Sequence, residues 1–135
     1  TSNAIFATPG VNIGLFCSTP MVALSRKVNR KDSMKMLLTG EPITASHAKE
    51  IGLINEFFSD KKLENEVVKI AKLIASKSNL VLKFGKNAFY KQLEMPLDKA
   101  YKFTSEIMVK NMMSRDAKEG INAFLEKRSP VWKNR

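Results

Sequence analysis

The stretch from Leu38 to Asn55, LTGEPITASHAKEIGLIN, organises the sequence on both sides of it. Gly40 can adopt the left-handed conformation that ends a helix, and Pro42 prevents that helix from continuing. Thr44 is a suitable N-cap, because its hydroxyl can accept a hydrogen bond from a free backbone N–H in the next turn. Gly52 stands where the new helix must stop. The stretch therefore predicts a helix end, a turn, a short helix over residues 45–51 and then a strand.

The chain before this stretch predicts an extended start followed by two helices. Residues 5–16, IFATPGVNIGLF, contain one proline and two glycines, which favours an extended segment or loop over a helix. A short helix is expected over residues 21–28. The next helix begins at Asn29 or Asp32, either of which can cap it.

The chain after this stretch predicts one strand and four amphipathic helices. Leu53–Phe58 is the expected strand, and the helices begin near residues 60, 80, 96 and 114. Short polar breaks between them favour antiparallel packing. Apolar residues recur at helical spacing, so one face of each helix is expected to point inward. These faces comprise Leu63, Val67, Ile70, Ala71 and Ile74; Val81, Phe84 and Ala88; Leu97, Ala100, Tyr101, Thr104, Ile107, Met108 and Met112; and Ala117, Ile121, Phe124 and Leu125.

Composition bounds the fold and its partners. With 135 residues, 44% of them hydrophobic, the chain suits one domain or a piece of a larger one. The net charge of +10 calls for an acidic partner or a lysine-rich solvated surface, and we favour the solvated surface. The basic residues are scattered along the chain, which weakens the case for nucleic acid as a partner.

Several functional classes lack the residues they need. Cys17 and His47 are each the only residue of their type, so the chain has no disulfide framework, no Cys/His metal site and no Ser-His-Asp triad. We expect His47 to be a surface histidine. No run of 18 apolar residues predicts a membrane span. No targeting segment is recognised at the start, and residues 1–4 are expected to be a cloning remnant, because Ser2-Asn3-Ala4 is typical of a cleaved tag.

Three segments resemble blocks of the crotonase superfamily, the enoyl-CoA hydratases and isomerases. Phe6–Gly14, FATPGVNIG, is similar to the family pattern F-x-x-P-E-(I/V)-x-x-G. Leu38–Asn55 is similar to the block TG-x-x-I-(S/T)-A-x-x-A-x-x-x-G-L. Asp116–Trp132, DAKEGINAFLEKRSPVW, resembles the closing helix, D-x-x-E-G-x-x-A-F-x-E-K-R-x-P-x-(F/W). The resemblance covers about residues 6–132, and one branch of the family shares the segment around Pro9 almost letter for letter.

The resemblance implies a mostly α fold: the C-terminal helical, trimerising region of a crotonase-like α/β spiral. Residues 5–28 would be the extended end of the spiral core plus a short helix, and residues 29–135 the helical region. Family members are trimers or hexamers, and the chain alone is expected to form a dimer or a larger oligomer. The implied compartment is a bacterial cytoplasm, or the mitochondrial matrix in a eukaryote.

The resemblance also implies acyl-CoA as the partner, with coenzyme A part of the substrate and no separate cofactor. Family members stabilise a thioester enolate with two backbone N–H groups, which together with the first catalytic glutamate would precede residue 1. Gly10 stands where the second catalytic glutamate is expected. Glycine can neither give nor take a proton, so the chain by itself is expected to be inactive.

Three residues are candidates for contacts with the substrate. By the resemblance, Phe124 would stack on the adenine of coenzyme A and Lys127 would lie near the adenine or the phosphates. Phe124 as a core residue and Lys127 as a solvated lysine are equally open. Asn12 could line the acyl pocket, although we favour a loop-capping role. The one dense basic cluster could meet phosphates, but we favour surface placement for it: Arg26, Lys27, Arg30 and Lys31.

The sequence leaves three functions open. The first is the C-terminal part of an acyl-CoA-binding, crotonase-type enoyl-CoA hydratase or isomerase. The second is a non-catalytic module for oligomerisation and coenzyme A binding. The third, which we favour least, is a basic RNA-binding protein.

Overall fold

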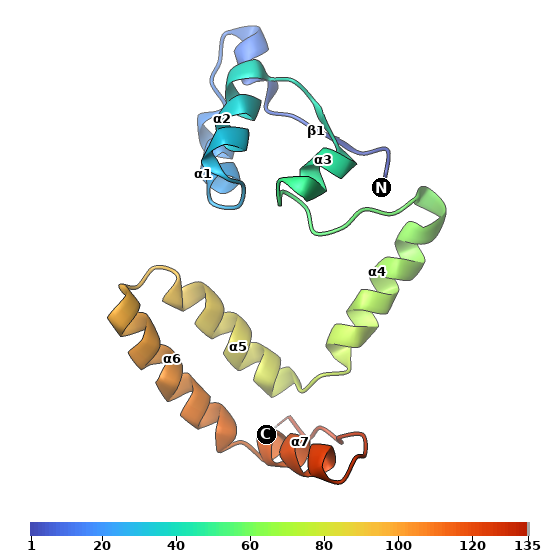
Figure 1. Cartoon of the computed structure of the whole chain (residues 1–135), viewed down its shortest axis with the longest axis vertical. Helices are drawn as coiled ribbons and strands as arrows, with labels where there is room; N and C mark the ends of the chain where they lie inside the picture. Colours follow the sequence, from blue (N-terminus) through green and yellow to red (C-terminus); the bar gives the residue numbers. More distant parts are fainter. Residues whose placement is uncertain (135) are drawn as a thin grey trace. The chain divides into compact units, whose positions relative to one another are not determined.

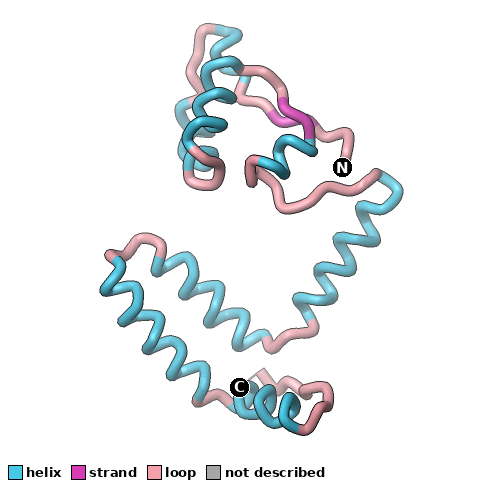
Figure 2. Tube along the Cα trace, in the orientation of Figure 1, coloured by secondary structure: helices cyan, strands magenta, loops and turns pink. Residues whose placement is uncertain are grey.

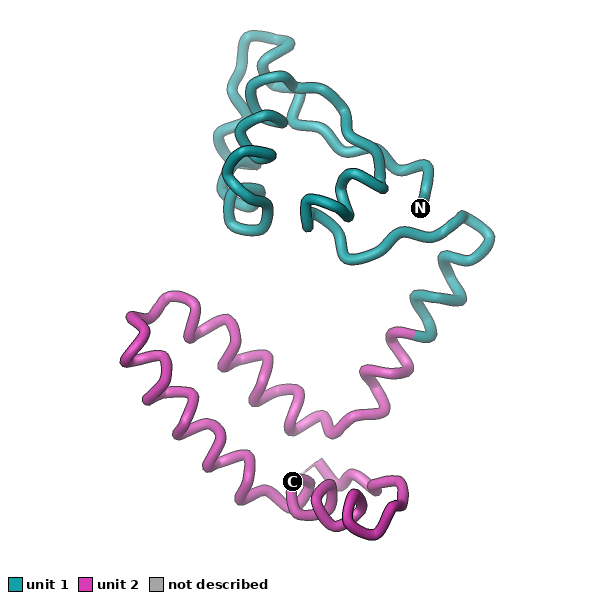
Figure 3. Tube along the Cα trace, viewed as in Figure 1, with its two compact units in different colours: residues 1–69 teal, residues 70–135 magenta. Residues whose placement is uncertain are grey.

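The computed structural model describes residues 1–134, and the chain divides into two compact units, with the boundary between residues 69 and 70 (Figure 3). Helices make up most of both units, as the sequence predicts (Figure 2). In chain order the elements are β1 (Ile5–Phe6), the 3-10 helix η1 (Pro9–Ile13), α1 (Ser18–Ser25), α2 (Arg30–Thr39), β2 (Ile43–Thr44), α3 (Ala45–Glu50), α4 (Asp60–Ala75), α5 (Asn79–Gln92), α6 (Leu97–Met112) and α7 (Arg115–Leu125).

In the stretch around α3, the residues predicted to end and cap the helices have those roles in the structure. Gly40 ends α2 in the left-handed conformation, with φ of 62°, and its N–H donates to the Met36 carbonyl at 3.0 Å. The Thr44 hydroxyl accepts from the His47 N–H at 3.3 Å and caps α3. Gly52, with φ of 77°, turns the chain out of α3. Two stops and one cap thus lie where the sequence placed them.

The strand predicted at Leu53–Phe58 is wrong. The N–H groups of Leu53 and Ile54 both donate to the Ala48 carbonyl, at 2.8 and 3.2 Å, so these donors close the end of α3 and do not join a sheet. The observed sheet instead pairs β1 with β2, antiparallel, with Ile5 opposite Thr44. Residues 43–44 pair because the turn after Gly40 leads them alongside the extended start of the chain.

The core of the first unit lies between α1 and α2, which run side by side in Figure 1. Its buried members are Leu24, Val28, Met36 and Leu37. Asn29 begins α2: its side-chain oxygen accepts from two backbone N–H groups of the first turn, each at 3.1 Å. Of the two starts that the sequence left open, Asn29 is the correct one.

The second unit follows the helix–break–helix pattern predicted from the sequence. Ser78 caps α5 and Ser114 caps α7 through their side-chain oxygens, and Pro96 precedes α6. α5 and α6 lie side by side and run in opposite directions (Figure 1). The predicted antiparallel packing is therefore confirmed for this pair.

The inward faces predicted for the helices are largely wrong. None of the described residues of α4 is buried. In α7 the buried residues are Asp116 and Ala123, whereas Ile121, Phe124 and Leu125 are exposed. Ala88 and Ala100 are the buried members of the faces of α5 and α6. Amphipathic spacing identifies an apolar face but not its partner, and within residues 1–134 most of these faces have none.

Two further predictions concern a membrane span and the division of the chain into segments. No helix formed by residues 1–134 has both the length and the apolar character needed to cross a bilayer. The division into residues 1–4, 5–28 and 29–135 by origin stays a prediction.

Candidate functional site

Gly10 lies in η1, and its surroundings leave no room for a side chain. Its N–H donates to the Sγ atom of Cys17 at 3.2 Å. A Cβ atom at position 10 would lie 2.8 Å from that sulfur and 2.8 Å from the carbonyl oxygen of Leu15. Because one of these atoms belongs to the backbone, the loop would have to move to accept any larger residue. Gly10 thus offers neither a proton-transfer group nor the space for one.

Asn12 lies against the end of α2. A Cβ atom at Gly40 would come within 3.1 Å of both the nitrogen and the oxygen of the Asn12 amide, and within 3.0 Å of Val11. The contact places Asn12 beside the C-cap of α2, with its side chain exposed on the other side. The loop-capping role that the sequence favoured stays a prediction. A role in the acyl pocket stays a prediction.

The second candidate region is the C-terminal end of α7. The Lys127 N–H donates to the Phe124 carbonyl at 3.2 Å, and the Arg128 N–H donates to the Ala123 carbonyl at 3.0 Å. These two bonds form the Schellman motif, which needs a left-handed residue just after the helix. Lys127 is that residue, with φ of 52°.

Arg128 is held against α7 by two carboxylates. Its guanidinium donates to both oxygens of Glu119, at 2.6 and 3.0 Å, and its Nε donates to Glu126 at 2.5 Å. Glu119 also accepts from the Val131 N–H at 2.8 Å. The bonds to Arg128 and Val131 lower the pKa of Glu119 from 4.5 to about 2. The carboxylate is therefore ionised at neutral pH, and it ties the tail to the helix.

Asp116 and Gly120 fix the rest of the tail. The Asp116 side chain is 1% exposed and accepts from the Ser78 hydroxyl and from the backbone N–H groups of Lys133 and Asn134. The Trp132 ring lies over Gly120, where a Cβ atom would come within 3.3 Å of it. The indole N–H of Trp132 donates to the Ser76 carbonyl at 2.8 Å. We call this set the tail lock: Asp116, Glu119, Gly120, Arg128 and Trp132.

The tail lock leaves Phe124 and Lys127 available to a ligand. The Phe124 side chain is 82% exposed, so it is not packed in a core formed by residues 1–134. The Lys127 side chain is exposed and has no hydrogen bond or ion pair among residues 1–134. Beside Phe124 lies a hollow of about 390 Å³, lined mainly by α7. A ring and a free ammonium group at one helix end could bind a planar, anionic molecule.

The remaining basic cluster is on the surface of the first unit. Arg26, Lys27, Arg30 and Lys31 are all exposed, at the end of α1 and the start of α2. The Arg26 guanidinium donates to the Val22 carbonyl of its own helix at 3.1 Å. Contact with phosphates stays a prediction for this cluster.

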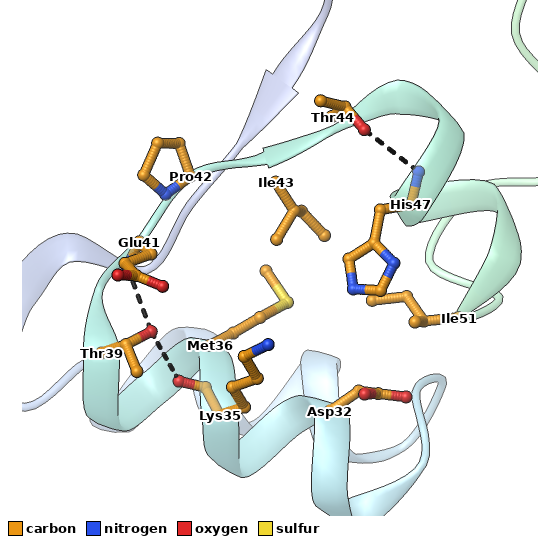
Figure 4. A pocket seen from close by; sticks show the side chains of 10 residues that line it. All are labelled: Asp32, Lys35, Met36, Thr39, Glu41, Pro42, Ile43, Thr44, His47 and Ile51. Atoms are coloured by element: carbon orange, nitrogen blue, oxygen red, sulfur yellow. Dashed lines mark hydrogen bonds between the residues drawn. The ribbon is translucent and has the colours of Figure 1, made fainter.

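A separate hollow of about 270 Å³ lies between α2, β2 and α3 (Figure 4). Met36, Ile43 and Ile51 face it together with the His47 ring. His47 contacts Glu50 through Nδ1 at 3.1 Å, and 40% of its side chain is exposed, in keeping with the surface placement predicted for it. Among residues 1–134 no three His, Cys, Asp or Glu side chains are grouped to hold a metal ion.

The sequence analysis missed the tail lock, although its residues stand in one of the quoted blocks. Asp116, Glu119 and Gly120 are spaced three and four residues apart, so they share one face of α7. The opposite charges of Glu119 and Arg128 also indicated a possible ion pair. The sequence did not predict that residues 128–134 fold back onto this face of α7.

The closing helix with its tail and the segment around Pro9 and Gly10 are the parts of the structure that resemble a crotonase-type protein. The family described as "Enoyl-CoA hydratase/isomerase" matches residues 1–135, and the chain belongs to this family.

Individual relatives place the chain more closely within the family. It is 54% identical over 127 residues to "Enoyl-CoA hydratase domain-containing protein 3, mitochondrial" of Rattus norvegicus, covering 94% of this chain and 42% of that protein. The crystal structure of human enoyl coenzyme A hydratase domain-containing protein 3 is similar, with a TM-score of 0.90 and 53% identity, covering 96% of this chain and 51% of that one. A Mycobacterium smegmatis enoyl-CoA hydratase gives a TM-score of 0.93 and 45% identity, covering 97% and 51%. The chain thus spans about half the length of these relatives.

Proposed function

We propose that this chain is the coenzyme A-recognising helical part of a crotonase-type protein that acts on acyl-CoA thioesters. The observation that carries the proposal is the end of α7, where Phe124 is exposed and the Lys127 side chain has no partner among residues 1–134. Phe124 stacks on the adenine, and Lys127 meets the adenine or the phosphates. Coenzyme A enters as part of the substrate, so no separate cofactor is needed.

Binding of coenzyme A to the 135-residue chain tests the proposal. Titration calorimetry with coenzyme A should give a complex, and pantetheine, which lacks the adenine and its phosphates, should bind far more weakly. Phe124→Ala should weaken coenzyme A binding about tenfold, the usual size of a base–aromatic stacking contribution. Tyr101→Ala is the matched control, because it removes an exposed ring from α6. Equal affinities for the Phe124→Ala variant and the unmodified chain would exclude this site.

The reaction of the whole protein depends on Gly10. With glycine at the second glutamate position, water addition lacks one of its two acid–base groups, and this chain alone is inactive. We expect the complete protein to hydrate crotonyl-CoA about 10²–10⁴-fold more slowly than a hydratase with two carboxylates. A rate equal to that of a two-carboxylate hydratase, measured by loss of the enoyl absorbance, would show that another residue supplies the proton.

Oligomerisation is the second candidate function, and the exposed apolar faces of α4, α6 and α7 favour it. In this alternative the chain supplies subunit contacts in a trimer or hexamer and binds coenzyme A without catalysis. Sedimentation of the chain over a range of concentrations tests this candidate, because a module that supplies subunit contacts gives a mass that rises with concentration, and a monomer at every concentration would exclude it.

RNA binding through the net charge of +10 remains the least favoured alternative. Binding to mixed-sequence RNA that persists at moderate salt, together with no binding of coenzyme A, would support it, since purely electrostatic contacts weaken steeply with salt.

For the compartment, we assign the mitochondrial matrix in a eukaryote and the cytoplasm in a bacterium. The rat relative described above carries the word mitochondrial in its name.

A further inference from the structure

Lys127 occupies a backbone conformation that disfavours a lysine. Its φ of 52° places it in the left-handed region, where a Cβ atom is crowded and glycine is the preferred residue after a helix. The lysine side chain makes no hydrogen bond or ion pair with the rest of residues 1–134, so the side chain itself does not offset this strain. Non-glycine residues held in sparsely populated backbone conformations are concentrated at active sites and ligand-binding sites.

The ion pair between Glu119 and Arg128 favours the left-handed conformation of Lys127. Arg128 directly follows Lys127, and its guanidinium forms two parallel hydrogen bonds with Glu119, at 2.6 and 3.0 Å. For the residue after Lys127 to reach back to Glu119, the chain must reverse within one residue. Lys127 is that residue. A bidentate ion pair both stabilises the reversed chain and restricts its geometry.

We propose that the Glu119–Arg128 ion pair is a positioning device, which holds Lys127 in its left-handed conformation so that its ammonium group is presented, together with Phe124, to the adenine nucleotide portion of coenzyme A. This inference rests on the proposed function of the same site. Glu119 and Arg128 are positioning residues, because they act on the ligand through the backbone of Lys127.

Simple electrostatics gives the opposite expectation for Glu119. Coenzyme A carries several negative charges, and a carboxylate close to its site repels it. If Glu119 acted only through its charge, its removal would tighten binding. If Glu119 acts by positioning, its removal frees Lys127 to leave the competent conformation, and the apparent affinity falls in proportion to the lost population. The sign of the change therefore distinguishes the two.

Glu119→Gln is the deciding variant, and Glu126→Gln is its matched control. Both remove one carboxylate from the same Arg128 guanidinium, but only the first breaks the bidentate pair. Titration of the 135-residue chain with coenzyme A should give about fivefold weaker binding for Glu119→Gln and unchanged or tighter binding for Glu126→Gln. Tighter or unchanged binding by Glu119→Gln, or an equal loss in both variants, would overturn the proposal. Circular dichroism checks that both variants keep their helices.

Lys127→Gly and Lys127→Met provide a second readout. Glycine removes the ammonium and relieves the backbone strain, whereas methionine removes the ammonium and keeps the strain. Both should lose coenzyme A affinity severalfold, but the glycine variant should melt about 4 °C higher than the methionine variant. The comparison cancels the loss of a cation at the helix C-terminus, which both variants share. Equal melting temperatures would show that position 127 is not strained.

The experiments distinguish a failure of the proposed coenzyme A site from a failure of the proposed positioning role of the Glu119–Arg128 ion pair. If Phe124→Ala leaves coenzyme A affinity unchanged, the proposed function of this site is wrong. If Phe124→Ala weakens binding and Glu119→Gln does not, the site stands and the positioning device is wrong.

Discussion

At the scale of single residues, Gly10 shows how closely packed neighbours can exclude a side chain. The Leu15 carbonyl and the Cys17 sulfur occupy the space that a Cβ atom at position 10 would need. The loop has therefore closed over the glycine, and its N–H bonds to the sulfur. A larger residue at position 10 would require the backbone around residue 15 to move.

Gly10→Ala should destabilise the chain by about 1–3 kcal/mol, the usual cost of overpacking a closely packed position. Gly85→Ala is the control, because Gly85 lies inside α5 with open space around it. Alanine at that position should stabilise the chain by about 0.5–1 kcal/mol, since it restricts the unfolded chain and favours helix. Urea denaturation followed by circular dichroism measures both changes. A neutral Gly10→Ala would mean that the loop over residues 15–17 yields easily.

At the scale of elements, α7 and the tail form one cooperative unit. Asp116 binds the backbone of residues 133 and 134, Glu119 binds Arg128 and Val131, and Gly120 admits the Trp132 ring. The quoted family block at the end of the chain is thus a folding motif as well as a candidate binding motif. Its acidic residues hold the tail, and the tail sets the conformation of Lys127.

Asp116→Ala should cost about 3 kcal/mol of unfolding free energy, because a buried serine hydroxyl and two backbone N–H groups lose a charged acceptor. Asp98→Ala is the matched control: both aspartates lie in the first turn of a helix, and Asp98 is exposed. The control should lose no more than about 0.5 kcal/mol, the size of an exposed charge–dipole interaction. Urea denaturation of the two variants gives the comparison, and equal losses would contradict the tail lock.

The tail lock should weaken in acid. The pKa of Glu119 falls from 4.5 to about 2 in the folded chain, so the unfolded state binds the proton more readily. The stabilisation by Glu119 is therefore complete above pH 4.5 and is lost as the pH falls from 4.5 towards 2. Trp132, the only tryptophan, should report this release by fluorescence, and Glu119→Gln should remove that part of the pH dependence. An identical acid transition in the variant would assign the release to another group.

At the scale of the whole chain, large apolar side chains remain exposed in both units. They include Ile5, Leu15, Leu73, Leu97, Tyr101, Met112 and Phe124. The solved relatives contain about as much polypeptide again as this chain. Faces of this extent usually mark interfaces, because an apolar patch exposed to water favours association.

The isolated chain should self-associate. Sedimentation velocity should show a mass that rises with concentration, and the dye ANS should bind strongly to the exposed apolar faces. Leu73→Lys, at a 60% exposed position of α4, should lower both signals without loss of helix. A monomer at every concentration with no dye binding would contradict this expectation.

The local features of the fold could be predicted because their causes are local. A left-handed glycine, a threonine cap and a proline act within one turn of the chain, so Gly40 and Thr44 were correctly assigned from sequence. Helical spacing likewise identified the amphipathic helices. The prediction of a strand at Leu53–Phe58 was wrong because the chain turns at Gly52, and the N–H groups of Leu53 and Ile54 then donate to the end of α3.

The sequence by itself determined the amphipathic helices, the helix stop at Gly40, the cap at Thr44, the family and the absence of a carboxylate at Gly10. Only the tertiary structure decided which apolar faces are covered, that a side chain at position 10 has no room, and that the tail folds back to strain Lys127. The reason is physical: caps and helical spacing depend on neighbours in the chain, whereas burial, close approach and the Glu119–Arg128 pair depend on residues that meet only after folding.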